Sequence, residues 1–286
     1  MPSAVAHARP AETESSPRRR MRIGRWMLNG VAAMSLTFIL LPLALVAWLA
    51  FFRQEIPSVP PEGYSLQWFS AVLNNKSFVE GFVLSVQVAV AATVIGLALA
   101  VPASLAVARQ RFRGRGVVNT LLLMPLIVPG VVLGTALYVF QIEAEIATGL
   151  PLLGTTTGLV AAHALIVIPW AARLVTASLA GFDLSIEEAA KNLGAPPWTT
   201  FRRVTVPAIW PGIVAAALFG FVMSFGNLEI SLFLVGAGRT TLPIAILQYL
   251  EWKIDPAVAA VSVIQIALIG AAMIVTDRYV KIARVV

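Results

Sequence analysis

The chain has 286 residues, of which 58% are hydrophobic and only 12% are charged. Soluble domains are about 45–50% apolar and about 25% charged, so this chain has too little polar material to cover a compact globule in water. The composition therefore excludes an ordinary soluble domain, a disordered chain and a nucleic-acid-binding protein. The net charge is +7, and the chain contains no cysteine, which excludes disulfides and thiolate metal sites.

Six long uncharged intervals follow one another along the chain. Each holds 21 to 28 residues without Asp, Glu, Lys or Arg, and about 20 mostly apolar residues cross a bilayer as a helix. The intervals lack the period-two alternation of barrel strands. We therefore predict an all-α integral membrane protein whose six-helix transmembrane domain covers residues 26–286. The helices are expected at about 28–52, 81–108, 117–141, 156–179, 208–235 and 257–276.

The basic residues outside these intervals are distributed unequally between the two sides of the membrane. Sixteen Lys and Arg lie in the N-terminal segment, the second and fourth connections and the C-terminal tail, and only four lie in the other connections. Basic residues accumulate on the cytoplasmic side of membrane proteins. We therefore expect both termini and the connection 181–207 in the cytoplasm, with residues 1–25 as a disordered basic tail.

The connection 181–207 differs from the rest of the chain because it is polar and has helix start and stop signals. Ser185 followed by Glu188 forms a capping-box pattern, which predicts a helix over residues 186–193. Gly194 stands where a helix C-terminus needs a left-handed residue. Taken by itself, the segment is compatible with an amphipathic loop that lies on the bilayer with its aromatic residues among the headgroups.

The same connection contains a longer pattern: E-A-A starting at Glu188, three residues, Gly194, nine residues, and then V-T-V-P ending at Pro207. It resembles the EAA loop, E-A-A-x3-G-x9-I-x-L-P, of permease subunits of bacterial ATP-binding cassette (ABC) importers. The chain departs from the pattern only at Val204 and Val206, and both changes are conservative. Because five positions are matched over a stretch of twenty residues, the resemblance is specific.

This resemblance implies a type I ABC importer permease, a multi-pass protein of the bacterial inner membrane. The connection would form coupling helices that dock on a separate ATPase. The implied partners are a second, different permease chain, two ATPase subunits and a solute-binding protein, and the ATPases rather than this chain would bind ATP and Mg. The implied coupling residues are Glu187, Glu188, Ala189, Ala190, Leu193, Gly194, Trp198, Phe201 and Pro207.

The chain is not expected to hydrolyse ATP itself. A Walker A loop needs Gly immediately before Lys, and the lysines of this chain follow Asn75, Ala190, Trp252 and Val280. No polar segment is long enough for a nucleotide-binding domain. We therefore predict a transport subunit that is not an enzyme and has no cofactor of its own.

The transported solute is suggested only by further resemblance. The segments M-P-L-I-V-P-G at 124–130 and S-F-G-N at 224–227 are similar to permeases of the spermidine/putrescine branch, which favours a polyamine or a related amino compound. Gly226 departs from that group, in which Asp is common at this position. Relatives of the branch also import ferric iron, thiamine or phosphonates, and these solutes remain alternatives.

Three polar residues of the fifth interval are candidates for the substrate pathway: Ser224, Asn227 and Glu229. Ionisable residues inside a membrane usually face a cavity or a partner. Glu229 either lines the pathway and attracts a cation, or pairs with a partner subunit or reaches the interface. The competing hypothesis from another class, a stand-alone secondary transporter, predicts inverted repeats or many intramembrane ionisable groups, and neither is visible in the sequence.

Overall fold

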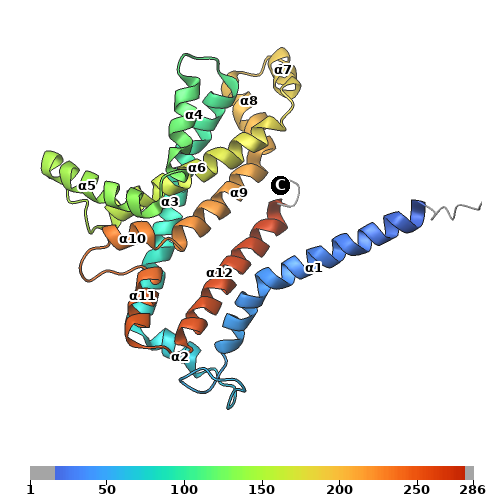
Figure 1. Ribbon diagram of the computed structural model, residues 1–286. Helices are drawn as coiled ribbons and strands as arrows, with labels where there is room; N and C mark the ends of the chain where they lie inside the picture. The colour runs from blue at the N-terminus through green and yellow to red at the C-terminus, as the bar shows by residue number, and fades with distance from the viewer. Residues whose placement is uncertain (1–16, 281–286) are drawn as a thin grey trace, which may run out of the picture. The chain divides into compact units, whose positions relative to one another are not determined.

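The computed structural model describes the backbone of residues 17–280 and the side chains of residues 26–278. The chain divides into two compact units, one ending at Trp48 and the other beginning at Leu49. Within the described residues the structure is helical, and the only β-type pairing is an isolated bridge between Phe52 and Tyr64. The α-helices are α1 (Pro17–Leu49), α2 (Gln67–Asn74), α3 (Lys76–Arg109), α4 (Arg115–Leu123), α5 (Gly130–Thr148), α6 (Thr156–Ala180), α7 (Ser185–Asn192), α8 (Pro197–Thr200), α9 (Val206–Phe225), α10 (Glu229–Leu234), α11 (Leu242–Trp252) and α12 (Ala257–Val280) (Figure 1).

Six helical segments are long and apolar enough to cross a membrane, which confirms the predicted all-helical class with six spans. The agreement has a simple cause, since the thickness of the hydrocarbon core sets a minimum length for each apolar helix. The six segments are Trp26–Leu49, Lys76–Arg109, Gly130–Thr148, Thr156–Ala180, Pro197–Phe225 and Ala257–Arg278.

The first unit consists of α1, which begins earlier than expected. Residues 1–25 were predicted to be a disordered tail, but the helix already starts at Pro17, so the prediction is wrong from that residue onwards. Proline is favoured at the first helical position, where its missing N–H has no helical partner, and arginine is a good helix former. The part of the predicted tail over residues 1–16 lies outside the described residues.

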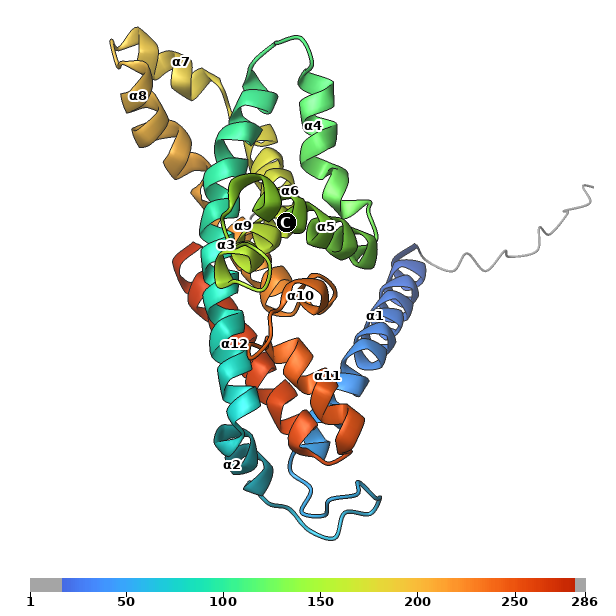
Figure 2. The same cartoon turned by 90° about the vertical axis from the view of Figure 1, so that its left-hand side faces the viewer.

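The core of the second unit is the packing of α3, α6 and α9 (Figures 1 and 2). Val167 of α6 lies between two glycines. A Cβ added at Gly96 of α3 would lie 2.6 Å from Val167 Cγ1, and one added at Gly220 of α9 would lie 2.7 Å from the same atom. Small residues at helix crossings are typical of membrane proteins because packing, rather than water exclusion, holds the helices together.

The third predicted span, 117–141, is wrong as a single helix. The chain forms α4, then a short 3₁₀ turn at Met124–Leu126, and begins the new helix α5 at Gly130. Pro125 and Pro129 explain the interruption, because proline has no backbone N–H to donate and its ring clashes with the preceding turn. Pro129 has an extended backbone, with φ −56° and ψ 137°, directly before α5.

The fifth predicted span, 208–235, is also divided. One continuous helical segment runs from α8 through a π-helical turn at Phe201–Thr205 into α9 and ends at Phe225, and α10 follows as a separate helix. The side-chain oxygen Oδ1 of Asn227 accepts a hydrogen bond from the backbone N–H of Ile230 at 3.0 Å. This local bond competes with continuation of α9 and caps the start of α10.

Candidate coupling loop and substrate pathway

The helix α7 ends in a turn that requires glycine. Gly194 has φ +82°, and its N–H donates to the carbonyl of Lys191 at 2.9 Å, while the N–H of Ala195 donates to the carbonyl of Ala190 at 3.1 Å. This pair of bonds is the Schellman motif, which satisfies carbonyls at a helix C-terminus and places a left-handed residue after the last turn. The predicted turn at Gly194 is therefore present.

The start of α7 differs from the prediction. No capping box forms between Ser185 and Glu188; instead, the Oδ1 atom of Asp183 accepts a hydrogen bond from the backbone N–H of Ser185 at 2.9 Å. Hydrogen bonds from the backbone and then the hydroxyl of Ser185 lower the pKa of Asp183 below its ordinary value, because they stabilise the ionised carboxylate. Aspartate is as good a helix cap as serine, and here it lies two residues earlier.

Glu187 lies inside the protein rather than on the expected docking surface. Its side chain is buried, and its Oε1 atom accepts hydrogen bonds from the Arg109 guanidinium at the end of α3 and from the Thr205 hydroxyl. The Arg109 guanidinium also lies 5.3 Å from the centre of the Phe182 ring, within the range of a cation–π interaction. Glu187 therefore holds α7 against α3, and its Oε1 atom is bound to two partners within this chain.

The other coupling residues present a different face. Leu193 is 89% exposed and Trp198 is 68% exposed, and Glu188, Ala189 and Gly194 are exposed beside them. Large apolar side chains are costly to leave in water, so this face has the chemistry of a binding surface. The remaining predicted coupling residues are Ala190 and Phe201, which are half-buried, and Pro207, which is exposed.

The two interrupted spans meet each other. The carboxylate of Glu229, at the start of α10, lies against Gly130, at the start of α5, so closely that a Cβ on Gly130 would overlap it. One turn further along, a Cβ on Gly134 would lie 2.6 Å from the Phe233 ring. Figure 2 shows α10 beside α5. Interrupted helices place free backbone groups within the membrane, and transporters use such points for solute binding.

Ser224 and Asn227 belong to a polar network that includes a buried histidine. His163 of α6 lies with Nδ1 2.8 Å from the Ser224 hydroxyl and Nε2 3.1 Å from the Ser231 hydroxyl. Ser231 donates its own proton to the Asn227 carbonyl at 2.8 Å, so it accepts from Nε2–H, and Ser224 donates to Nδ1. Ser224 is thus buried and committed to His163, whereas Asn227 is half-buried and Glu229 is exposed.

Four further residues complete these two sites, namely Arg109, Thr205, His163 and Ser231. Sequence reasoning did not assign any of them a functional role. Arg109 and Glu187 are 78 positions apart, and His163 and Ser231 are 68 positions apart. A single sequence contains no signal for pairings at this distance. A histidine among apolar residues needs a hydrogen-bonding partner, but the sequence does not say which residue provides it.

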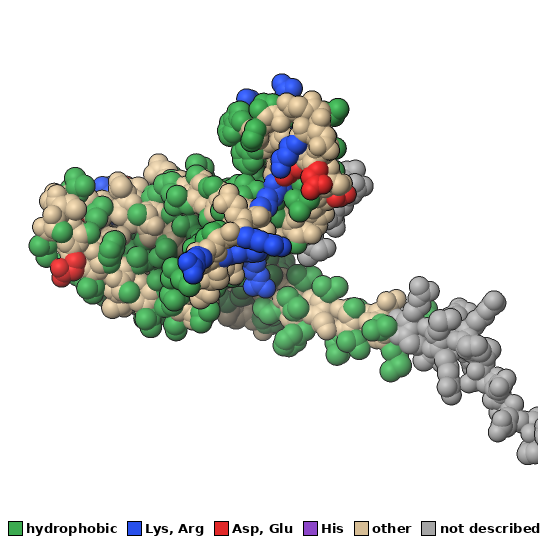
Figure 3. Space-filling model, turned by 90° about the horizontal axis from the view of Figure 1, so that it is seen from above, with side chains coloured by type: hydrophobic (Ala, Val, Ile, Leu, Met, Phe, Trp, Pro, Cys, Tyr) green, Lys and Arg blue, Asp and Glu red, His purple; other side chains and the backbone are tan. Residues whose placement is uncertain are grey.

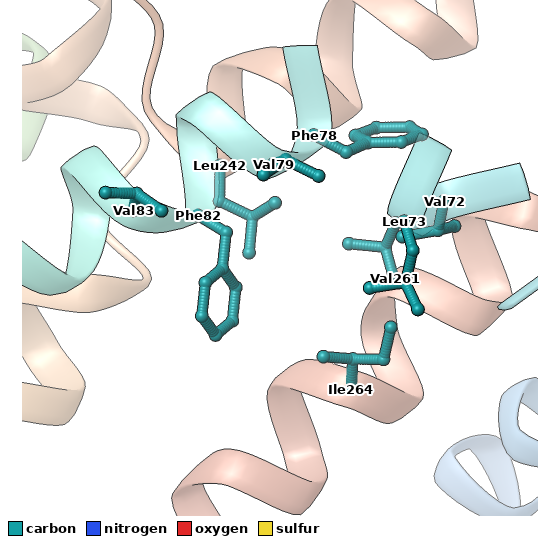
Figure 4. Close-up of a pocket in the computed structure, with 9 residues that line it drawn as sticks. All are labelled: Val72, Leu73, Phe78, Val79, Phe82, Val83, Leu242, Val261 and Ile264. Carbon is teal, nitrogen blue, oxygen red and sulfur yellow. The ribbon is translucent and has the colours of Figure 1, made fainter. Parts of the chain in front are cut away.

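A third feature, an apolar pocket of about 130 Å³, lies between α2, α3, α11 and α12. Figure 4 shows that its nine lining side chains, among them Phe78, Phe82 and Leu242, are all hydrocarbon. Such a lining offers neither a charge nor a hydrogen bond to a polar solute. The interruption at Glu229 and Gly130 is therefore the better candidate for solute recognition.

Comparison with known proteins places the chain in a family. The family described as "Binding-protein-dependent transport system inner membrane component" matches residues 92–283. The putrescine transport system permease protein PotI of Escherichia coli (strain K12) is 27% identical over 241 residues, which cover 84% of this chain and 85% of PotI. The molybdenum transport system permease protein ModB of Mycobacterium bovis is 32% identical over 216 residues, which cover 72% of this chain and 81% of ModB.

Solved structures have the same fold. A bacterial ABC transporter involved in import of the acidic polysaccharide alginate matches with a TM-score of 0.67 at 17% identity, covering 95% of this chain and 99% of that one. The methionine ABC transporter MetNI, in inward-facing conformations, matches with a TM-score of 0.60 at 19% identity, covering 73% and 96%. The predicted importer-permease fold is confirmed. The chain belongs to the family of binding-protein-dependent transport system inner membrane components, and it is a multi-pass permease subunit of an ABC importer.

Proposed function

We propose that this permease couples to a separate cytoplasmic ATPase through α7 and α8, and that it conducts a small cationic solute past Glu229. A polyamine or a related amino compound is the favoured solute. The working transporter would contain a second, different permease, two ATPase subunits that bind ATP and Mg, and a solute-binding protein. It would lie in the bacterial inner membrane with both termini of this chain in the cytoplasm.

The coupling role rests mainly on the exposed face of α7 and α8. Leu193 and Trp198 project from short helices whose positions are held by the Glu187–Arg109 ion pair. Tryptophan is among the residues that most often carry the binding energy of a protein interface. A rigid projection of this kind transmits motion by packing, since closely packed groups move together rather than deform.

Introducing a charge into the docking face tests this role. We expect Leu193→Asp to remove the ATPase subunits from the purified complex and to lower ATP-dependent uptake at least about tenfold. An unpaired carboxylate buried in an apolar interface costs more than about 1.4 kcal/mol, which corresponds to a tenfold change. The matched control is Leu150→Asp in the connection between α5 and α6, where the leucine is 62% exposed. Retention of the ATPases and normal uptake by Leu193→Asp would contradict the proposal.

The solute proposal rests on Glu229. Its carboxylate lies where the interrupted third and fifth spans meet, and a carboxylate in that position attracts a cation rather than an anion. The relative PotI is named as part of a putrescine transport system, which agrees with this chemistry. The relative ModB is named as part of a molybdenum transport system. The higher identity to ModB makes an oxyanion such as molybdate the second candidate, although Glu229 would repel it.

Uptake assays with both solutes distinguish the candidates. With putrescine, we expect Glu229→Gln to raise KM about tenfold or more while the protein inserts and assembles normally, since the loss of one charge–charge contact in a membrane site is worth roughly 1–3 kcal/mol. Glu143→Gln, at an exposed carboxylate of α5, is the control. Uptake of molybdate but not putrescine by the unmodified transporter would overturn the cationic proposal and leave the coupling proposal intact.

A further inference from the structure

A polar cavity of about 450 Å³ lies between the end of α3, the start of α4 and α7. We propose that this cavity binds a phosphate group, either of an anionic phospholipid headgroup or of free phosphate. Its charged lining consists of Arg109, Arg111, Arg115, Lys191, Glu187 and Glu188. The substrate pathway does not use these side chains, and none of them lies near Glu229 in the chain.

The charges of the cavity favour an anion. Four cationic side chains face it and only two carboxylates do. Glu187 is already neutralised by Arg109, so Arg111, Arg115 and Lys191 are opposed by Glu188 alone. Figure 3, which looks onto this end of the molecule, shows Lys and Arg side chains gathered there with a smaller acidic group beside them.

Arg109 provides a second, independent observation. Its Nη1 atom is bound to Glu187, but its Nη2 atom is buried and has no hydrogen-bond partner among the described residues. A buried donor without an acceptor costs free energy. Arginine presents its N–H groups in a fixed fork that fits two oxygens of a phosphate, and the Arg109 side chain is part of the cavity lining.

The surroundings of the cavity favour a lipid as the source of the phosphate. Arg115 opens α4, and the next residues of that helix include Val117 and Leu121, which are 62% and 57% exposed. A phospholipid whose headgroup occupied the cavity would find apolar side chains for its tails on this helix. The predicted cytoplasmic position of this end also places it at the leaflet where basic residues meet anionic headgroups.

The charge-neutralising double variant Arg111→Gln/Arg115→Gln tests the site. The matched control is Arg113→Gln, which removes an exposed arginine from the same loop but not from the cavity lining. The full chain, purified with its partner permease and without the ATPases, is placed in nanodiscs containing phosphatidylglycerol or phosphatidylcholine. Lipid that stays bound after extraction is counted by native mass spectrometry. Omitting the ATPases separates this test from the coupling proposal.

We expect wild type and Arg113→Gln to retain phosphatidylglycerol in preference to phosphatidylcholine. The double variant should retain about tenfold less phosphatidylglycerol, because each basic residue near a membrane surface changes the affinity for anionic lipid on the order of several-fold. Inorganic phosphate is titrated into lipid-depleted samples of the same three proteins. Phosphate binding that the double variant loses, without any preference for phosphatidylglycerol, would assign the site to free phosphate.

Equal retention of both lipids and equal binding of inorganic phosphate by all three proteins would overturn the proposal. If the double variant does not assemble, Arg115→Lys takes its place. Lysine keeps the charge but lacks the planar fork, so a phosphate site predicts weaker binding by Arg115→Lys than by Arg113→Gln. The reverse order would count against the site.

Discussion

The carboxylate of Glu187 in α7 is bound to the guanidinium of Arg109, which is the last residue of α3. The two residues are 78 positions apart in the chain. The same carboxylate oxygen accepts the hydroxyl proton of Thr205, in the π-helical turn that leads into α9. One buried carboxylate thus joins α7, α3 and the start of the fifth span. Movement of α7 would therefore be passed to two membrane-crossing helices without an intermediate flexible segment.

Removal of this carboxylate should loosen the loop. Glu187→Ala leaves the Arg109 guanidinium and the Thr205 hydroxyl without their acceptor, and loss of one partner from a mostly buried ion pair costs about 3 kcal/mol. We expect a lower melting temperature and faster proteolysis of the segment 181–205. Hydrogen exchange of the amides of α7, measured by mass spectrometry, should rise in the same variant.

The neighbouring carboxylate is the control for that experiment. Glu188 is exposed, so Glu188→Ala should leave the melting temperature and hydrogen exchange nearly unchanged, while it lowers uptake if this side chain contacts the ATPase. Equal destabilisation by Glu187→Ala and Glu188→Ala would show that the buried ion pair does not hold the loop.

The turn after α7 makes a second prediction. Gly194 has φ +82°, and no described atom lies within 4 Å of an added Cβ, so the strain of Gly194→Ala comes from the backbone and not from a clash. A left-handed alanine costs about 1–2 kcal/mol. We expect ATP-dependent uptake to fall while the spans still insert. Asparagine tolerates the left-handed region, so Gly194→Asn should retain more uptake than Gly194→Ala in the same assay.

Much of the fold was predictable because a bilayer imposes simple constraints. An apolar helix must exceed a minimum length, and that rule alone identified six spans. The rule does not say whether a span is continuous. Pro125 and Pro129 indicated a kink in the third span, but whether proline kinks or ends a helix depends on which neighbours satisfy the freed backbone groups. The fifth span was harder still, because Asn227 caps a new helix that no composition change announces.

The site was predictable in position but not in orientation. The motif located the loop, yet it did not distinguish Glu187 from Glu188, since adjacent helical residues differ by only about 100° in direction. The buried partner of one of them, Arg109, decides which carboxylate turns inward. In the same way, Ser224 is hydrogen-bonded to His163, 61 positions away, and the sequence did not indicate this partner.

The cap at the start of α7 gives a pH-dependent prediction. Hydrogen bonds from Ser185 lower the pKa of Asp183 in the folded protein. The ionised Asp183 carboxylate therefore stabilises the folded protein fully at a pH above its unfolded-state pKa of about 3.9. This stabilisation is lost as the pH falls through the lower folded-state pKa. A carboxyl NMR titration of the full chain in detergent should show an Asp183 midpoint below that of an unstructured aspartate.

Two substitutions at Ser185 separate the contributions to that pKa. Ser185→Ala removes only the hydroxyl and should keep most of the lowering, because the backbone N–H is the larger cause. Ser185→Pro removes the N–H itself. We expect the midpoint to rise more in Ser185→Pro than in Ser185→Ala. An equal midpoint in wild type and Ser185→Pro would show that the cap does not form in solution.

The crossing of α3 and α6 provides the last prediction. A Cβ at Gly96 would lie 2.6 Å from Val167 Cγ1 and 2.8 Å from Val167 Cβ, so Gly96→Ala should destabilise the protein by about 1–3 kcal/mol through overpacking. Val167→Ala alone leaves a cavity and is also destabilising. Val167→Ala removes the nearer contact atom, Cγ1, but keeps Cβ. The double variant should therefore relieve part of the overpacking and be somewhat more stable than the sum of the two losses predicts.

Thermal unfolding of the four proteins in one detergent measures that coupling directly. Gly270→Ala on α12 is the control, since no described atom lies within 4 Å of a Cβ built at Gly270, and alanine is the better helix former there. Gly270→Ala should be neutral or slightly stabilising. Strict additivity of Gly96→Ala and Val167→Ala would mean that the two side chains do not touch, and the packing of α3 on α6 would then differ from the arrangement described above.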